Sequence, residues 1–152
     1  MEEILNQFSG KLYEKKDILK WNLPKQIQEQ IQLEQFDHFF LASSKEERHG
    51  GFRHVHLAIY SIMYSEVYLI VVETNKIEPK KINQILSILN QKNYDIIVSN
   101  GFCKKKDVCY FGVYFSSQVK PNLNELTEKI NKLENINAVH IIEYTCEGCK
   151  IE

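Results

Sequence analysis

The chain has 152 residues, of which 43% are hydrophobic and 26% are charged, and its formal net charge is −1. This composition is that of one globular domain or of two small ones, and the near-neutral charge argues against strong general affinity for nucleic acid or acidic membranes. The apolar runs are shorter than the roughly 20 residues of a membrane span, and the acidic start is unlike a secretory signal. We therefore predict an intracellular protein, cytoplasmic or nuclear, without a membrane segment.

Residues 1–65 are predicted to form short helices and a β-hairpin. Pro24 can occupy the first turn of a helix because that position loses no hydrogen bond. A polar loop over residues 43–52, which contains Gly50 and Gly51, would join the two strands of the hairpin. The predicted helices cover residues 4–8, 16–21 and 24–33, and the predicted strands cover residues 36–42 and 53–61.

This order of helices, strand, loop and return strand resembles a winged helix. The resemblance implies that residues 24–33 form a recognition helix and that the loop 45–51 forms the wing. Residues 1–65 carry eight Lys and Arg against nine Asp and Glu, whereas DNA-binding modules are normally basic. The alternative is that these elements only cover a sheet. The candidate nucleic-acid-binding residues are Lys25, Gln26, Gln28, Arg48 and Arg53.

Residues 67–72 are the most apolar stretch of the chain. Four of the six are β-branched, and apolar and polar side chains do not alternate. A strand with this pattern is typically buried on both faces. We therefore predict that residues 67–72 form the central strand of a sheet.

The remaining residues predict two amphipathic helices and three more strands. Apolar residues recur from Ile82 to Leu89 with the spacing of one helix face. The second helix opens at Pro121, where Asn122 can cap it and Glu125 can complete a capping box. The predicted strands cover residues 94–99, 108–115 and 138–142, with a turn that begins at Asn100 and Gly101.

This element order, β-α-β-β-α-β over residues 66–144, predicts an α+β protein with a ferredoxin-like sheet. It resembles the small-molecule-sensing ACT domains and the effector domains of some bacterial regulators. ACT domains hold an amino acid at the loop after the first strand and usually carry a glycine there; the corresponding residues 74–78 contain none. The helix-free face would need a cover, either residues 1–65 or a second subunit.

Two histidines suggest a competing enzymatic function. His54 and His56 are two residues apart in a predicted strand, so their side chains would share a face. The pattern resembles the His-hydrophobe-His motif of rolling-circle initiators and single-strand transposases, in which a divalent ion polarises the scissile phosphate and a tyrosine attacks it. Neither predicted helix of residues 66–144 contains such a tyrosine.

The cysteines offer a second possible metal site. Cys146 and Cys149 form a C-x-x-C pair in a tail over residues 146–152, and Cys103 and Cys109 flank the lysine-rich turn. Disulfides are rare inside cells, so we predict thiols or ligands of zinc or another divalent metal. The predicted sheet separates the two pairs by about 17–20 Å, too far for one intrachain zinc site.

These patterns favour a non-enzymatic binding or regulatory protein in three parts: residues 1–65, residues 66–145 and the tail. It would be either a winged-helix-type DNA-binding regulator with an ACT-like sensing half or a subunit of a larger complex. We expect a homodimer or a complex, with nucleic acid as one candidate partner. The alternative is a metal-dependent single-strand nuclease.

Overall fold

The computed structural model describes residues 4, 7–43, 47–49, 52–54, 56–146 and 148–151, and only the backbone of residues 47–49, 52–54 and 148–151. The structure is mixed α+β, with two antiparallel sheets and few helices. Among the described residues, no helix combines the length and apolar character needed to cross a membrane. The chain divides into two compact units, residues 1–65 with 145–148 and residues 66–144 with 149–152, and each is described by itself.

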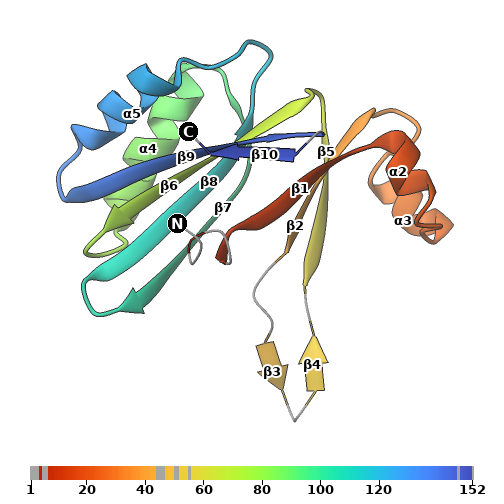
Figure 1. The fold of residues 1–152 in the computed structure, drawn as a ribbon, viewed down its shortest axis with the longest axis horizontal. Helices are drawn as coiled ribbons and strands as arrows, with labels where there is room; N and C mark the ends of the chain where they lie inside the picture. Colours follow the sequence, from red (N-terminus) through yellow and green to blue (C-terminus); the bar gives the residue numbers. More distant parts are fainter. Residues whose placement is uncertain are drawn as a thin grey trace. The chain divides into compact units, whose positions relative to one another are not determined.

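The first unit contains a three-stranded antiparallel sheet of order β1-β2-β5 (Figure 1). Two short helices lie between β1 and β2 in the sequence, and Ile18, Leu33 and Phe39 form a buried cluster. The elements are β1 (Ser9–Glu14), α2 (Lys15–Leu19), α3 (Lys25–Gln30), β2 (His38–Ser43) and β5 (Leu57–Ile62). A separate two-stranded ribbon pairs β3 (Glu47–His49) with β4 (Phe52–His54).

This unit differs from the sequence predictions in three places. Strand β1 was not predicted. Gly10 lies inside this strand, where an added Cβ would overlap the ring of Phe40. The helix predicted over residues 24–33 is shorter, since Gln32 adopts a left-handed φ of 51° beyond the end of α3. The strand predicted over residues 53–61 is divided between β4 and β5. Of the predicted first helix, residues 5 and 6 lie outside the described residues.

The second unit contains a five-stranded sheet of order β10-β9-β6-β8-β7. Strand β8 pairs antiparallel with both β6 and β7, and helices α4 and α5 cover one face of the sheet (Figure 1). The elements are β6 (Glu66–Thr74), α4 (Pro79–Gln91), β7 (Asp95–Lys105), β8 (Val108–Ser116), α5 (Leu123–Asn131), β9 (Ile136–Thr145) and β10 (Gly148–Ile151).

Strand β6 is the centre of this unit, as residues 67–72 predicted. It lies between β9 and β8, and all six residues from Val67 to Val72 are fully buried. On the helix-covered face, Tyr68, Ile70 and Val72 pack with residues of both helices, among them Ile85 and Leu126. Burying apolar side chains contributes about 1.5–3 kcal/mol each, so this contact stabilises the unit strongly.

The β7–β8 hairpin turns later than predicted. Its tight turn contains Lys106 and Asp107, and Asp107 adopts a left-handed φ of 63°. Gly101 lies within β7, where an added Cβ would come 2.9 Å from Cδ1 of Ile77. The glycine therefore permits close packing against the loop after β6 and does not mark a turn. The predicted tail also differs, because residues 148–151 form strand β10 beside β9.

Helix α5 begins with the predicted cap. The side chain of Asn122 accepts a hydrogen bond of 3.1 Å from the backbone N–H of Glu125. The carboxylate of Glu125 binds the ammonium groups of Lys92 at 2.8 Å and Lys129 at 3.0 Å. Hydrogen bonds from Lys92 and Lys129 hold the pKa of this carboxyl below its usual value. Glu125 therefore links α5 to the end of α4 instead of completing a capping box.

Replacing Asn122 with alanine is expected to lower the free energy of unfolding by about 1 kcal/mol, because one N–H at the start of α5 loses its acceptor. Urea denaturation measures the change. Asn124→Ala, on an exposed position of the same helix, is the control and should change stability by less than about 0.5 kcal/mol. Equal effects of the two substitutions would contradict the assigned cap.

Candidate functional site

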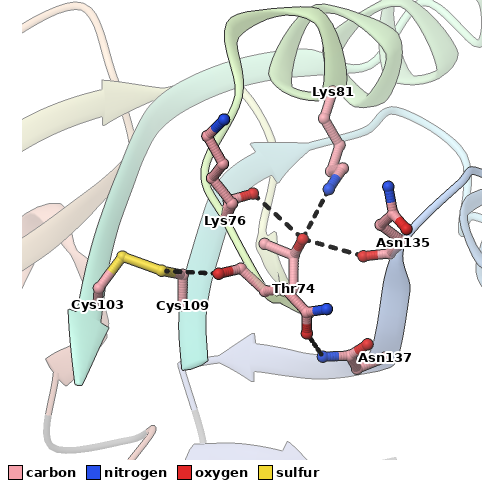
Figure 2. The surroundings of a disulfide bond; sticks show 8 residues. Thr74, Lys76, Lys81, Cys103, Cys109, Asn135 and Asn137 are labelled. Carbon is pink, nitrogen blue, oxygen red and sulfur yellow. Dashed lines mark hydrogen bonds between the residues drawn. A yellow bond between two sulfur atoms is a disulfide. The ribbon is translucent and has the colours of Figure 1, made fainter. Parts of the chain in front are cut away.

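The most unusual side chain of the second unit is the buried lysine Lys81, in the first turn of α4. The residue is 7% exposed, and its ammonium donates a 2.7 Å hydrogen bond to the hydroxyl of Thr74 at the end of β6 (Figure 2). Among the described residues, no carboxylate forms an ion pair with it. A buried ammonium with one neutral partner retains unused hydrogen-bonding capacity, since it carries three donors.

Thr74 is the junction of this arrangement. Its side chain is almost completely buried, and its hydroxyl oxygen lies 3.0 Å from the carbonyl oxygen of Asn135 and 3.2 Å from that of Lys76. The single hydroxyl proton can be donated to either carbonyl while the oxygen accepts from Lys81. Thr74 thus joins the end of β6, the start of α4 and the turn before β9, as Figure 2 shows.

Asn75 extends the same network. Its side-chain oxygen accepts a 2.8 Å hydrogen bond from the amide nitrogen of Asn137, on β9. Its backbone carbonyl oxygen lies 3.7 Å from Sγ of Cys109, on β8. The loop after β6 is therefore held from two sides by neighbouring strands of the sheet.

A polar pocket of about 260 Å³ opens beside this network, between the start of α4 and the end of α5. Three lysines, Lys80, Lys81 and Lys132, line it together with Glu78 and Glu134. The carboxylate of Glu78 lies 3.3 Å from the ammonium of Lys76, which offsets its charge. The pocket therefore has an excess of positive charge.

The start of α4 adds to this positive character. The helix is 13 residues long, and no side chain caps its amino end. The first backbone N–H groups of a helix have no acceptor within the helix, and Pro79 at the first position has no N–H to leave unsatisfied. The N–H groups of Lys80 and Lys81 thus lie at the same end of the helix as the lysine side chains. Together these groups favour an anion.

A disulfide lies next to this network and corrects the prediction of free thiols. Cys103 on β7 and Cys109 on β8 face each other in the strand register and are covalently joined. The sequence contained a signal for this pairing, because the two cysteines are equally distant from Lys106 in the turn. The prediction failed because it derived the cysteine state from the expected cell compartment instead of the hairpin register.

The structure describes the side chains of only some of the other predicted metal ligands. Cys146 is free and exposed; partial desolvation of its sulfur raises the pKa of the thiol, and the carboxylates of Glu14 and Asp17 add to this effect. A raised pKa disfavours the thiolate that binds metal. The side chain of Cys149 lies outside the described residues. Among the described residues, no three side chains form a metal-binding group.

The histidine pair does not form one regular strand. His54 ends β4, and His56 lies between β4 and β5. The side chain of His54 and residue Val55 lie outside the described residues. In the second unit, Tyr68 is fully buried and donates a 2.5 Å hydrogen bond to Glu66. Burial, and then Glu66, raise the pKa of this phenol.

The predicted nucleic-acid residues of α3 are partly engaged within the protein. Lys25 forms a 3.8 Å ion pair with Glu29, and the amide of Gln28 donates to the carbonyl of Leu23 at 2.6 Å. Gln26 is exposed. A hollow of about 330 Å³ beside this helix is lined by Lys25 and Gln28 but also by Glu29 and Glu34, which disfavours phosphate.

Arg48 and Arg53 lie directly opposite each other in the β3–β4 ribbon. Their side chains, and residues 45, 46, 50 and 51 of the predicted wing, lie outside the described residues. The structure therefore brings the backbones of these two arginines together.

Neither Lys81 nor Thr74 was among the predicted site residues. A signal for Lys81 was present, because the buried stripe of α4 consists of Lys81, Ile85 and Leu89, spaced four residues apart. A lysine at the first position of such a stripe is expected to face the sheet with its stem buried. Its partner Thr74 is separated from it by the loop after β6, and no local pattern indicates their hydrogen bond.

Comparison of the sequence with protein-family models finds no match, and comparison with curated proteins finds no significant match. Functional assignment therefore depends on the geometry of the pocket and its charged groups.

Proposed function

We propose that this chain is a non-enzymatic binding or regulatory protein whose second unit binds a small anion in the pocket beside Lys81. The single observation that carries the proposal is Lys81, a residue only 7% exposed whose ammonium has a hydroxyl as its partner instead of a carboxylate. An anion in the pocket would supply the missing negative charge.

The ferredoxin-like and ACT-like part of the proposal has support from the sheet order. The first and third strands of residues 66–144, β6 and β8, lie between β9 and β7, and helices follow β6 and β8 in the sequence. The pocket lies beside the loop after the first strand, which is where ACT domains hold their ligand. The lysines make a carboxylate or phosphate group the expected ligand chemistry.

Inorganic phosphate is a suitable first probe. Added to the isotope-labelled full chain, it should shift the backbone amide signals of Lys80, Lys81 and Asn135 saturably, because these residues line the pocket. Lys81→Met should weaken binding by about tenfold or more, since a hydrogen bond to a charged group contributes about 1.5–3 kcal/mol. Sodium chloride at equal ionic strength controls for general screening.

Lys106→Met is the matched control, because Lys106 is an exposed lysine in the β7–β8 turn. It should leave phosphate binding unchanged. Phosphate shifts that do not saturate, or an equal loss of affinity in the two lysine variants, would overturn the proposal.

A DNA-binding role of residues 1–65 is the second candidate. The observation that favours it is the β3–β4 ribbon, in which Arg48 lies opposite Arg53, as in a wing that contacts phosphates. We expect such a regulator to retard duplex DNA at low salt and to lose affinity steeply as salt increases. Replacing both arginines with alanine should remove the retardation. Absence of any retardation at low salt would exclude the DNA-binding role of residues 1–65 and leave the anion-binding proposal for the second unit unaffected.

A further inference from the structure

We infer that Cys103 and Cys109 form a redox-responsive site whose state regulates anion binding in the Lys81 pocket. This inference rests on the proposed function, because it names the regulation of the same pocket. It joins two observations: an accessible disulfide, and a chain of contacts from that disulfide to the groups that hold Lys81.

The disulfide is accessible from one side only. Cys103 is exposed on β7, the last strand at one edge of the sheet, whereas Cys109 is 3% exposed on β8. An attacking thiolate must approach the accessible sulfur, so Cys103 is the point of attack and Cys109 is the leaving group. The order of bond breaking is therefore defined: the reductant bonds to Cys103, and Cys109 is released first.

The buried sulfur contacts the pocket network directly. Cys109 faces Thr74 in the β6–β8 register, and its Sγ lies 3.7 Å from the carbonyl oxygen of Asn75 (Figure 2). Thr74 accepts the hydrogen bond from Lys81, and Asn75 accepts the one from Asn137. One strand pairing thus separates the disulfide from the hydroxyl that holds the buried ammonium.

The chemical step is a thiol–disulfide exchange with a dithiol reductant. One thiolate of the dithiol attacks Sγ of Cys103, which forms a mixed disulfide and releases Cys109 as a thiolate that takes up a proton. The second thiol of the reductant then attacks its own sulfur in the mixed disulfide and releases Cys103 as a thiol. The protein gains two electrons and two protons, and the dithiol leaves as its own disulfide.

Reduction changes the chemistry of the contact between Cys109 and Asn75. A disulfide sulfur has no proton to donate, whereas the thiol of Cys109 can donate to the carbonyl of Asn75. The hairpin between Cys103 and Cys109 also loses its covalent closure. The lost closure acts on the end of β8 that pairs with Thr74, so the reduced protein holds Lys81 less firmly and binds anions more weakly. We expect a decrease of about fivefold or more, as for allosteric coupling between sites.

The test uses the full chain with Cys146→Ser and Cys149→Ser, so that only the Cys103–Cys109 pair responds to dithiothreitol. Phosphate affinity and amide hydrogen exchange are measured in the oxidised and reduced forms. We expect weaker phosphate binding and faster exchange at Thr74, Asn75 and Asn135 after reduction. Faster exchange confined to the hairpin over residues 102–110 overturns the inference.

Two variants separate the covalent link from the new donor. Cys103→Ser keeps the thiol of Cys109 and should reproduce the reduced affinity without any response to dithiothreitol. Cys109→Val lacks both the covalent link and the donor and should bind phosphate no more tightly than the reduced form. If phosphate binds equally to both forms, the regulation is wrong and the pocket proposal stands. If phosphate binds to neither form, the pocket proposal fails and the regulation fails with it.

Discussion

Replacing Ile70 with alanine is expected to lower the free energy of unfolding of the second unit by about 2–5 kcal/mol, the usual cost of truncating a fully buried isoleucine. Ile70 lies at the middle of β6 and is completely buried against residues of both helices, including Ile85 and Ile130. The substitution removes these contacts and leaves a cavity that a rigid sheet fills poorly. Urea denaturation followed by circular dichroism of the backbone measures the loss.

Ile27→Ala is the matched control, because the same atoms are removed from a side chain that is 37% exposed. It should cost less than about 1 kcal/mol, as expected for a partly exposed position. A similar loss of stability in the two variants would contradict the central position of β6.

Thr74→Val has the second large effect. Valine keeps the volume of threonine but removes the hydroxyl that accepts from Lys81 and donates to Asn135 or Lys76. The ammonium of Lys81 would then lose its hydroxyl partner. We expect a loss of about 1–3 kcal/mol, the usual cost of removing the partner of a buried polar group. Thermal or urea unfolding measures it, and Thr127→Val on α5 is a partly exposed control.

The double variant Thr74→Val with Lys81→Met identifies the cause of that loss. Methionine removes the charge while it keeps most of the apolar stem, so the double variant should regain most of the stability. Recovery would mean that the single variant was destabilised by the unpaired ammonium. If the double variant is as unstable as Thr74→Val, the loss comes from the carbonyl partners of Thr74 and the buried charge is not the cause.

The elements that the sequence predicted correctly are those with strong local patterns. The uninterrupted apolar run of β6 predicted a strand buried on both faces, and the helical spacing from Ile82 to Leu89 predicted α4. Asn122 before α5 predicted its cap, since capping depends on the next three residues only. In each case the signal and the structure lie within one element.

The errors arose where the structure depends on residues distant in the sequence. Gly10 and Gly101 resemble a helix end and a turn, but each lies in a strand where another side chain, Phe40 or Ile77, occupies the space of a Cβ. The Cys103–Cys109 disulfide depends on the β7–β8 register, whereas the prediction of thiols rested on the expected cell compartment. Lys81 became a candidate only when its partner Thr74 was located. Local propensity cannot indicate such contacts.

The most direct test of the account is the signal of the Lys81 ammonium nitrogen in nuclear magnetic resonance spectra recorded during addition of phosphate. A buried ammonium bonded to Thr74 exchanges its protons slowly enough to be observed, unlike exposed lysines. The account predicts a protected Lys81 signal that shifts saturably with phosphate and disappears in Lys81→Met. A protected Lys81 signal that phosphate leaves unchanged at every concentration would contradict it.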